Sequence, residues 1–529
     1  MALKDLFSNS KVLQNFFKRK NLDTAIENAA SGGLEKTLGV WDLIILGVGA
    51  IIGSGIFAIV GVAAAGDNGA GPALIVSMII AAIACIFSAL CYSEFATMIP
   101  VAGGAYMYTF ATLGEFMAWL IGWILMLEYA IGFIAVACAW TNHFMQFIKG
   151  FTAFLPEFIT NPPQWLISDY RNAAEFYLAQ GLDPQGVIPH IFGIPFCINL
   201  PAIFMIALTT LILIKGTKDS AKMAGLMVFI KLAVIAIFVI AGAFFVRPEN
   251  WTPFAPNGFE GVFMGAFIIF FAYIGFDALA TAAEECKNPQ KDLPIGIIGS
   301  LLITTIVYTL VALVLTGMQD TSGTVPAAFL QAPMAYCMTM TGKAWATYAS
   351  YFVALGSIAG LTSVLLVLHM ASTRVLYAMT RDNFLPKVFL KIHPKFGTPH
   401  ILTIVVGILG AIGTIFLDLN VAASLCNFGT FTSFIIVCVA VLILRKIEPN
   451  RERPFKVPCC PLFPLLGIFC CGGLMVFSMI VAKGEAAYIA TMLFILWVVI
   501  GIFIYLSYGY RKNRLAEKLS DSKKVDENI

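Results

Sequence analysis

The sequence predicts an all-α integral membrane protein with twelve transmembrane helices. Its 529 residues are 59% hydrophobic and only 12% charged, and the mean hydropathy is +0.87. A soluble domain carries about 25% charged residues, and a disordered chain carries far less apolar mass. The apolar residues form long unbroken runs, which are typical of membrane helices and unlike the short alternating strands of an outer-membrane barrel.

Twelve apolar runs are long enough to cross a bilayer. They cover residues 43–65, 72–93, 116–142, 198–214, 223–246, 261–283, 295–318, 344–373, 401–417, 421–444, 459–482 and 486–510. With a cytoplasmic N-terminus, 27 of the 33 Lys and Arg residues lie inside, five lie outside and one, Lys231, lies within a span. Because Lys and Arg gather on the cytoplasmic side, both termini are predicted to be cytoplasmic.

The spans divide the chain into successive parts. These are a cytoplasmic tail (1–40), a first group of five helices (41–246), a second group of five (260–444), two last helices (459–510) and a C-terminal tail (511–529). Leu13, Phe16 and Phe17 stand among basic residues, which predicts an amphipathic segment on the inner leaflet. A tail without fixed structure is the alternative.

Two spans are interrupted at the same depth. After ten apolar residues the first span meets Gly53-Ser54-Gly55, and after ten the sixth meets the segment 271–275. Five spans separate corresponding positions, and because five is odd the second copy is inserted upside down. Matched interruptions in inverted halves are the best sequence indication of a transport site, whereas glycines used only for close helix packing are the alternative.

Interrupted helices expose backbone groups with opposite polarity. The second half of the first span begins near Ser54 and Gly55, where free N–H groups and the positive end of the helix dipole suit a carboxylate. The first halves of the two spans end near Ile51 and near 271–274, where free carbonyls suit an ammonium group. A ligand with both groups on one carbon is an α-amino acid.

Four ionisable residues lie within the spans, where charge is costly enough to suggest function. Lys231 could release and take up a proton during a transport cycle, or act as a fixed cation between helices. Glu128 could face the pocket or pair with a polar neighbour. Asp277 is expected to cap or pair within the inner gate, and His369 to be a neutral, hydrogen-bonded packing residue.

Several motifs carry a family resemblance. The run Gly47–Phe57 resembles the first helix of the amino acid–polyamine–organocation superfamily. The runs 270–289, 122–129, 374–386 and 453–458 resemble its cationic amino acid transporter family, and the overall length is similar to that of the bacterial, twelve-helix branch.

The resemblance implies a five-plus-five inverted repeat of the leucine-transporter type, with broken helices 1 and 6 and two additional C-terminal helices. It implies that backbone N–H groups of Ser54 and Gly55 bind the substrate carboxylate. The carbonyls implied to bind the ammonium are those of Ile51, Phe271, Ala272 and Ile274. Lys231 matches a lysine that takes the place of sodium in proton-coupled members.

Two further positions concern specificity. The resemblance places Leu361 where members for long basic substrates have smaller residues, so a leucine there favours small neutral amino acids. Glu128 matches an acidic position associated with cationic substrates, which favours the opposite. We therefore expect a proton-coupled symporter of small neutral L-amino acids, working by alternating access. The alternative is a uniporter or exchanger of arginine, lysine or ornithine on the same fold.

Other classes of protein fit less well. A non-transporting sensor would need a sizeable output domain, and a membrane enzyme would need clustered catalytic groups, whereas the titratable residues in the spans are scattered. No cofactor, metal or nucleic acid is expected. The expected partners are the amino acid, a proton and the lipid of the bacterial inner membrane, while a small membrane subunit and the oligomeric state stay open.

Overall fold

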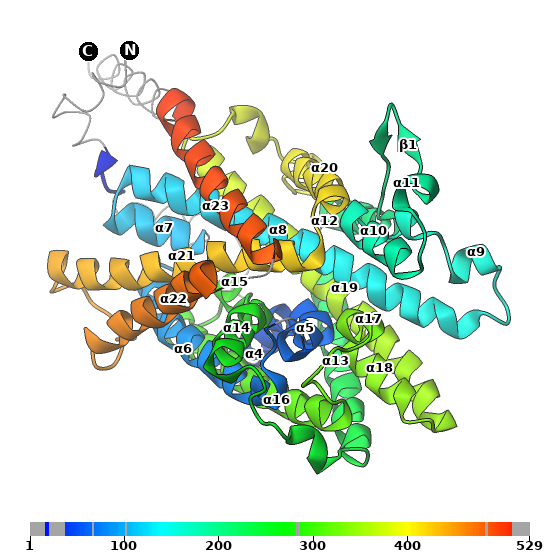
Figure 1. Cartoon of the computed structure of the whole chain (residues 1–529). Coiled ribbons are helices and arrows are strands. Elements are labelled where there is room, and N and C mark those ends of the chain that lie inside the picture. Colours follow the sequence, from blue (N-terminus) through cyan, green and yellow to red (C-terminus); the bar gives the residue numbers. More distant parts are fainter. Residues whose placement is uncertain are drawn as a thin grey trace, which may run out of the picture.

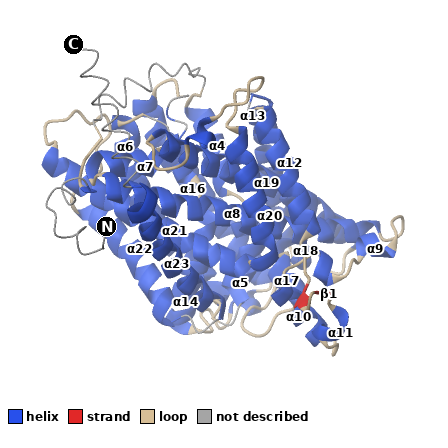
Figure 2. Ribbon diagram, turned by 90° about the horizontal axis from the view of Figure 1, so that it is seen from above, coloured by secondary structure: helices blue, strands red, loops and turns tan. Residues whose placement is uncertain are grey.

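A computed structural model describes residues 16–20, 38–65, 68–100, 103–216, 218–281, 283, 286–481 and 485–509. Most of the predicted N-terminal amphipathic segment, including Leu13, and the C-terminal tail 511–529 lie outside the described residues. The described part of the chain is a bundle of helices, with one two-stranded hairpin at its edge (Figures 1 and 2).

The long helices follow the apolar runs of the sequence. They are α6 (Leu74–Met98), α8 (Glu115–Ile148), α12 (Leu200–Lys215), α13 (Lys218–Ala243), α16 (Pro289–Met318), α19 (Ala344–Arg381), α20 (His400–Phe416), α21 (Leu419–Ile447), α22 (Leu462–Val481) and α23 (Glu485–Ile504). Two further helices are broken: α4 (Val40–Ile51) with α5 (Val60–Ala65), and α14 (Gly258–Phe270) with α15 (Phe276–Thr281). A short helix, α7 (Gly104–Thr112), joins α6 to α8.

Many of these helices can cross a membrane. Among the described residues, nine are long and apolar enough, and the bent pair Val40–Ile51 and Gly55–Ala65 makes a tenth if counted as one span. Two shorter apolar helices, α12 and α20, have 16 and 17 residues. The chain is therefore a multi-pass membrane protein, while the count of twelve spans stays a prediction.

The two longest helices lie at the centre of the bundle. α8 has 34 residues and α19 has 38, and they pack along each other; α21 also packs on α8. On the other side, α16 packs against α6 and α4. Figure 1 shows α8 and α21 passing through the middle of the bundle, close to both broken helices. This arrangement surrounds the broken helices with buried side chains of other helices.

A small cap of short elements connects α8 to α12 at the edge of the bundle (Figures 1 and 2). It contains α9 (Glu157–Thr160), α10 (Tyr170–Ala179), α11 (Pro184–Val187) and the strands β1 (His190–Ile191) and β2 (Ile194–Pro195). Side chains of Asp169, Asp183 and Asn199 accept hydrogen bonds at the first turns of α10, α11 and α12. Such N-caps satisfy backbone donors that a helix leaves free.

The described residues of the N-terminal tail pack on the protein. The ring of Phe16 stacks on that of Phe116 at 5.5 Å between centroids, and the Lys20 ammonium lies 2.8 Å from the Asp382 carboxylate. The backbone N–H of Lys20 also donates to the carbonyl of Phe110. Phe17 is 65% exposed. Residues 16–20 thus cross the start of α8 and the end of α19.

Candidate functional site

The first broken helix changes direction at the predicted glycine-rich turn. α4 ends at Ile51, Ile52 adopts an extended conformation (φ −72°, ψ 100°), and a π-helical turn from Gly55 to Ile59 leads into α5. The two halves are bent by 43°. The first N–H groups of a helix have no partner within it, so the backbone at Ser54 and Gly55 offers donors inside the bundle.

The second broken helix also opens where the sequence predicted. α14 ends at Phe270 and a single 3₁₀ turn covers Phe271 to Tyr273; Ile274 is extended, with φ −66° and ψ 139°. Gly275 follows with φ +122°, a conformation that L side chains rarely adopt, and α15 begins at Phe276.

The two breaks touch each other. A Cβ atom at Gly55 would lie 2.2 Å from the Cα atom of Ala272, and one at Gly275 would lie 2.8 Å from the carbonyl oxygen of Ala50. Only glycine allows the backbones to approach this closely. Each break therefore supplies a glycine that packs against the other break, and the predicted carboxylate and ammonium positions become neighbours.

A small buried cavity lies at this crossing. The breaks contribute Ala50, Ile51, Gly53, Ser54, Gly55, Phe271 and Ile274; α8 contributes Gly132 and Val136, α19 contributes Val364 and Leu368, and α21 contributes Cys426. None of these lining side chains is ionisable except the Cys426 thiol. The cavity volume is about 20 Å³, which suits about one water molecule. An amino acid can enter only if the surrounding helices move apart.

The Ser54 side chain is a notable part of the lining. It is buried, and its hydroxyl has no hydrogen-bond partner among the described residues. Buried hydroxyls normally find a partner, because burial without one is costly. A ligand carboxylate in the cavity would supply one.

Lys231 lies behind the first break. It comes from α13 and is fully buried, and its ammonium donates to the carbonyl oxygens of Gly49 at 2.5 Å and Ile52 at 2.7 Å. The hydroxyl of Ser363 on α19 is 3.4 Å away. An ammonium has three donors, and here each has an oxygen within reach. These carbonyls belong to the C-terminal end of α4, where the helix dipole favours a cation.

Tyr308 completes the crossing, and the sequence analysis did not identify it. Its hydroxyl, from α16, lies 3.0 Å from the carbonyl oxygen of Ile51 and 2.9 Å from that of Ala272. One hydroxyl has one proton, so it can donate to only one of the two at a time. Two of the four carbonyls predicted to bind an ammonium thus share a single donor from the protein.

The two acidic residues lie beside the cavity without lining it. Glu128 is buried one helical turn from Gly132 on α8, and its carboxylate accepts a hydrogen bond from the Ser433 hydroxyl at 3.2 Å. Asp277, near the start of α15, accepts a hydrogen bond from the Tyr129 hydroxyl. Glu128 therefore pairs with a polar neighbour, which was the second alternative for this residue. Asp277 is paired, as expected.

The remaining predicted residues take these positions. Leu361 is buried on α19 and shares the face of Val364 and Leu368, but it is not among the lining residues. A ring nitrogen of His369 lies 3.0 Å from the carbonyl oxygen of Thr403, as expected for a hydrogen-bonded packing residue.

A second buried histidine was missed. His143 lies within α8, beyond the predicted end of the third span, and its Nε2 is 3.1 Å from the carbonyl oxygen of Phe57 in the π-helical turn. The sequence analysis ended the third span at residue 142 and so left His143 outside the spans.

Two broken helices that cross at a buried cavity within a multi-pass bundle define a membrane transport protein of the broken-helix type. Comparison with known proteins identifies the family. The profile of the family described as "Amino acid permease" matches residues 38–504. The chain therefore belongs to the amino acid permeases of the amino acid–polyamine–organocation superfamily.

The similar proteins are transporters and permeases rather than enzymes. The "Methylthioribose transporter" of Bacillus subtilis is 38% identical over 508 residues, which cover 96% of this chain and 100% of that protein. The "Branched-chain amino acid permease BcaP" of the same organism is 38% identical over 94% of this chain and 98% of its own length. "Cationic amino acid transporter 1" of Arabidopsis thaliana is 35% identical over 78% of this chain and 63% of its own length.

Proposed function

We propose that this permease is a proton-coupled symporter of small neutral L-amino acids. In this proposal the carboxylate binds the N–H groups of Ser54 and Gly55 together with the Ser54 hydroxyl. The ammonium binds carbonyls of Ile51, Phe271, Ala272 and Ile274. The observation that supports the proposal is the crossing of the two breaks, where the backbone at Ser54 and Gly55 and that at Phe271 and Ile274 line one small cavity.

The character of the lining supports a neutral side chain. The cavity is lined by aliphatic and aromatic residues such as Val136, Val364 and Leu368, and a cationic side chain there would be desolvated without a counter-charge. One oxygen of the Glu128 carboxylate accepts a hydrogen bond from Ser433, and Glu128 is not among the residues that line the cavity. The relative named as a branched-chain amino acid permease is consistent with neutral substrates. We retain Leu361 as a proposed limit on side-chain length, acting from one turn beyond Val364.

Proton coupling is assigned to Lys231. While protonated, it holds the Gly49 and Ile52 carbonyls through its ammonium. Loss of the proton removes the charge that these carbonyls stabilise and frees the end of α4 to move. The cycle then exchanges one proton at Lys231 as the inner half of the first helix opens and closes. The protein is proposed to lie in the bacterial inner membrane, with five-plus-five inverted repeats and cytoplasmic termini.

A second candidate is exchange or uniport of cationic amino acids. It is favoured by the buried carboxylate of Glu128, one helical turn from the cavity residue Gly132, and by relatives named as cationic amino acid transporters. In that case substrate entry would have to rearrange the Glu128–Ser433 hydrogen bond.

The test is uptake of labelled alanine into proteoliposomes with an inward proton gradient and no sodium. Unlabelled leucine, arginine and methylthioribose are added separately as competitors. We expect gradient-driven accumulation that leucine reduces and arginine leaves unchanged. If alanine does not accumulate but labelled arginine enters by exchange, the cationic alternative holds. Entry of labelled methylthioribose, with no entry of alanine or arginine, would contradict an amino-acid substrate.

A further inference from the structure

A second, larger hollow opens on the outer surface of the bundle, away from the transport cavity. It has a volume of about 710 Å³ and lies between the first turns of α16 and the segment Pro454–Phe455 that connects α21 to α22. That segment belongs to the motif 453–458, which carries part of the family resemblance and has no role in the proposed transport site. We call this hollow the α16 groove.

One side of the α16 groove is an apolar stripe. Ile295, Ile298, Gly299 and Leu302 recur at intervals of three and four residues, so they share one face of α16. The stripe extends along about 10 Å of helix. Ile295 is 43% exposed and Leu302 is 48% exposed. Because these side chains belong to a helix apolar enough to cross a membrane, we expect their exposed surface to face the acyl chains of the bilayer.

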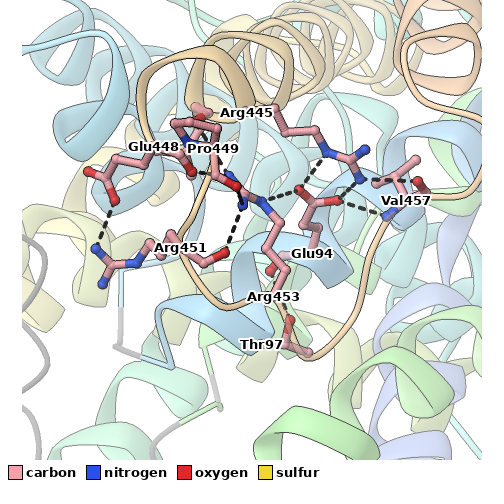
Figure 3. A network of polar contacts seen from close by, with 9 residues as sticks. Glu94, Thr97, Arg445, Glu448, Pro449, Arg451, Arg453 and Val457 are labelled. Atoms are coloured by element: carbon pink, nitrogen blue, oxygen red, sulfur yellow. Dashed lines mark hydrogen bonds and ion pairs between the residues drawn. The ribbon is translucent and has the colours of Figure 1, made fainter.

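The segment on the other side of the groove is flanked by residues bound to a buried carboxylate, whose contacts Figure 3 shows. Glu94 of α6 is 2% exposed and accepts two hydrogen bonds from Arg445, at 3.0 and 2.5 Å. It also accepts one from the backbone N–H of Val457 at 2.7 Å, and Arg453 approaches it to 3.4 Å. The residues on both sides of Pro454–Phe455 are therefore fixed, so this wall is part of the folded structure.

The mouth of the groove is cationic. Lys291 lines it, and the exposed Lys456 directly follows the lining residue Phe455 in the sequence. Among the described residues, neither Lys291 nor Lys456 forms an ion pair. The acidic residues nearest to Lys291 and Lys456 in the sequence are Asp292, which is 6% exposed, and Glu452, which is exposed. The mouth therefore provides positive charge at one end of the apolar stripe of the α16 groove.

We propose that the α16 groove binds one anionic phospholipid of the leaflet on this side of the membrane, which the distribution of Lys and Arg predicts to be cytoplasmic. Its phosphate lies at Lys291, and one acyl chain lies along Ile295, Ile298 and Leu302 against Phe455. Both halves of the site match such a lipid, because a basic residue at the membrane surface attracts an anionic headgroup and the stripe suits a hydrocarbon chain. The lipid bridges α16 to the segment that Glu94 holds.

The test compares lipids on the purified full-length protein in a neutral detergent. Phosphatidylglycerol or phosphatidylcholine of equal chain length is titrated, and retained lipid is counted by native mass spectrometry while the unfolding midpoint is recorded. The variants are Lys291→Gln at the mouth and Ile298→Trp in the stripe. Lys391→Gln, an exposed lysine on the connection between α19 and α20, is the matched control.

We expect the wild type to retain phosphatidylglycerol in preference to phosphatidylcholine and to unfold at a higher temperature with it. Lys291→Gln should weaken this binding about fivefold, the usual contribution of one basic residue near a membrane surface. Ile298→Trp should remove it, and Lys391→Gln should leave it unchanged.

Three results would overturn the proposal. They are equal retention of the two lipids by the wild type, full retention of phosphatidylglycerol by Lys291→Gln, and the same stabilisation by glycerol phosphate without acyl chains. A groove variant that changes the oligomeric state instead of lipid retention would assign the surface to a second copy of the chain. These results do not depend on the transported substrate, so they are separate from the proposed function.

Discussion

The break between α4 and α5 and the break between α14 and α15 have a similar backbone form, but different side chains donate hydrogen bonds to them. At the first, the Lys231 ammonium holds the carbonyls of Gly49 and Ile52. At the second, the Tyr308 hydroxyl reaches the carbonyl of Ala272, and it also reaches Ile51 across the crossing. Lys231 is a charged donor and contacts the first break alone, whereas Tyr308 is a neutral donor and contacts both breaks.

This difference assigns separate roles to the two breaks. An ammonium can lose its charge by giving up one proton, whereas a phenol hydroxyl stays protonated at neutral pH. In the proposed cycle, a change in protonation therefore acts directly at Lys231 on the first helix, while the Tyr308 hydroxyl keeps its proton. We infer that the first helix carries the proton-dependent movement, and that the second break serves mainly to complete the substrate site.

The closest contact between the breaks should give the largest effect. Gly55→Val would place side-chain atoms where Ala272 now lies, 2.2 Å from the position of a Cβ atom. We expect uptake and exchange both to fall to the level of protein-free liposomes, with a loss of stability of about 1–3 kcal/mol. Gly473→Ala on α22, where a Cβ atom meets nothing within 4 Å, is the control. Normal transport by Gly55→Val would contradict the claim that transport requires the close contact between the two breaks.

The role of the Lys231 ammonium is tested by Lys231→Met, which keeps the length of the side chain and removes its charge. We expect proton-driven accumulation of alanine to disappear, while exchange of alanine across the membrane continues. Lys215→Met at the exposed end of α12 is the matched control. Counterflow assays measure the exchange. If accumulation survives in Lys231→Met, the coupling role of this residue is wrong.

Loss of the Tyr308 hydroxyl should reduce transport less than the changes at Gly55 and Lys231. Tyr308→Phe leaves the Ile51 and Ala272 carbonyls without this donor, and a buried unsatisfied group costs about 1–3 kcal/mol. Transport should fall about tenfold, with its dependence on pH unchanged. Initial rates measured across a series of external pH values check both points, with the exposed Tyr348→Phe as control. A shifted pH profile would contradict the division of roles.

The smallest effect is expected at Ser54. Its hydroxyl has no partner among the described residues, so Ser54→Ala should not lower the unfolding temperature. If the hydroxyl binds the substrate carboxylate, loss of one hydrogen bond should raise KM about threefold to tenfold. Ser357→Ala, whose hydroxyl bonds within α19, is the control. An unchanged KM would show that the Ser54 hydroxyl does not bind the substrate carboxylate.

Sequence patterns were sufficient for features that depend on composition within one span. Glycines interrupting an apolar run mark the breaks near Ser54 and Gly275, and a single lysine in an apolar run marks Lys231. The helical class followed from the long apolar runs, and the structure shows those helices. The superfamily was indicated by the resemblance of several motifs and is confirmed by the family match.

Features that depend on packing between helices were not predictable. Tyr308 reads as one more large residue in an apolar run, and its two carbonyl partners are set by how α16 packs on α4. The rotation of α19 likewise decides that Val364 and Leu368 line the cavity while Leu361 does not. The Glu94 cluster joins residues more than 350 positions apart in sequence.

The most direct test of proton coupling at the first break is proton movement caused by the substrate. Proteoliposomes containing the wild type and a trapped pH-sensitive dye receive alanine outside, without sodium and without an imposed proton gradient. The account predicts that alanine acidifies the interior in the wild type and leaves it unchanged in Lys231→Met. Entry of labelled alanine into wild-type liposomes without acidification would contradict it.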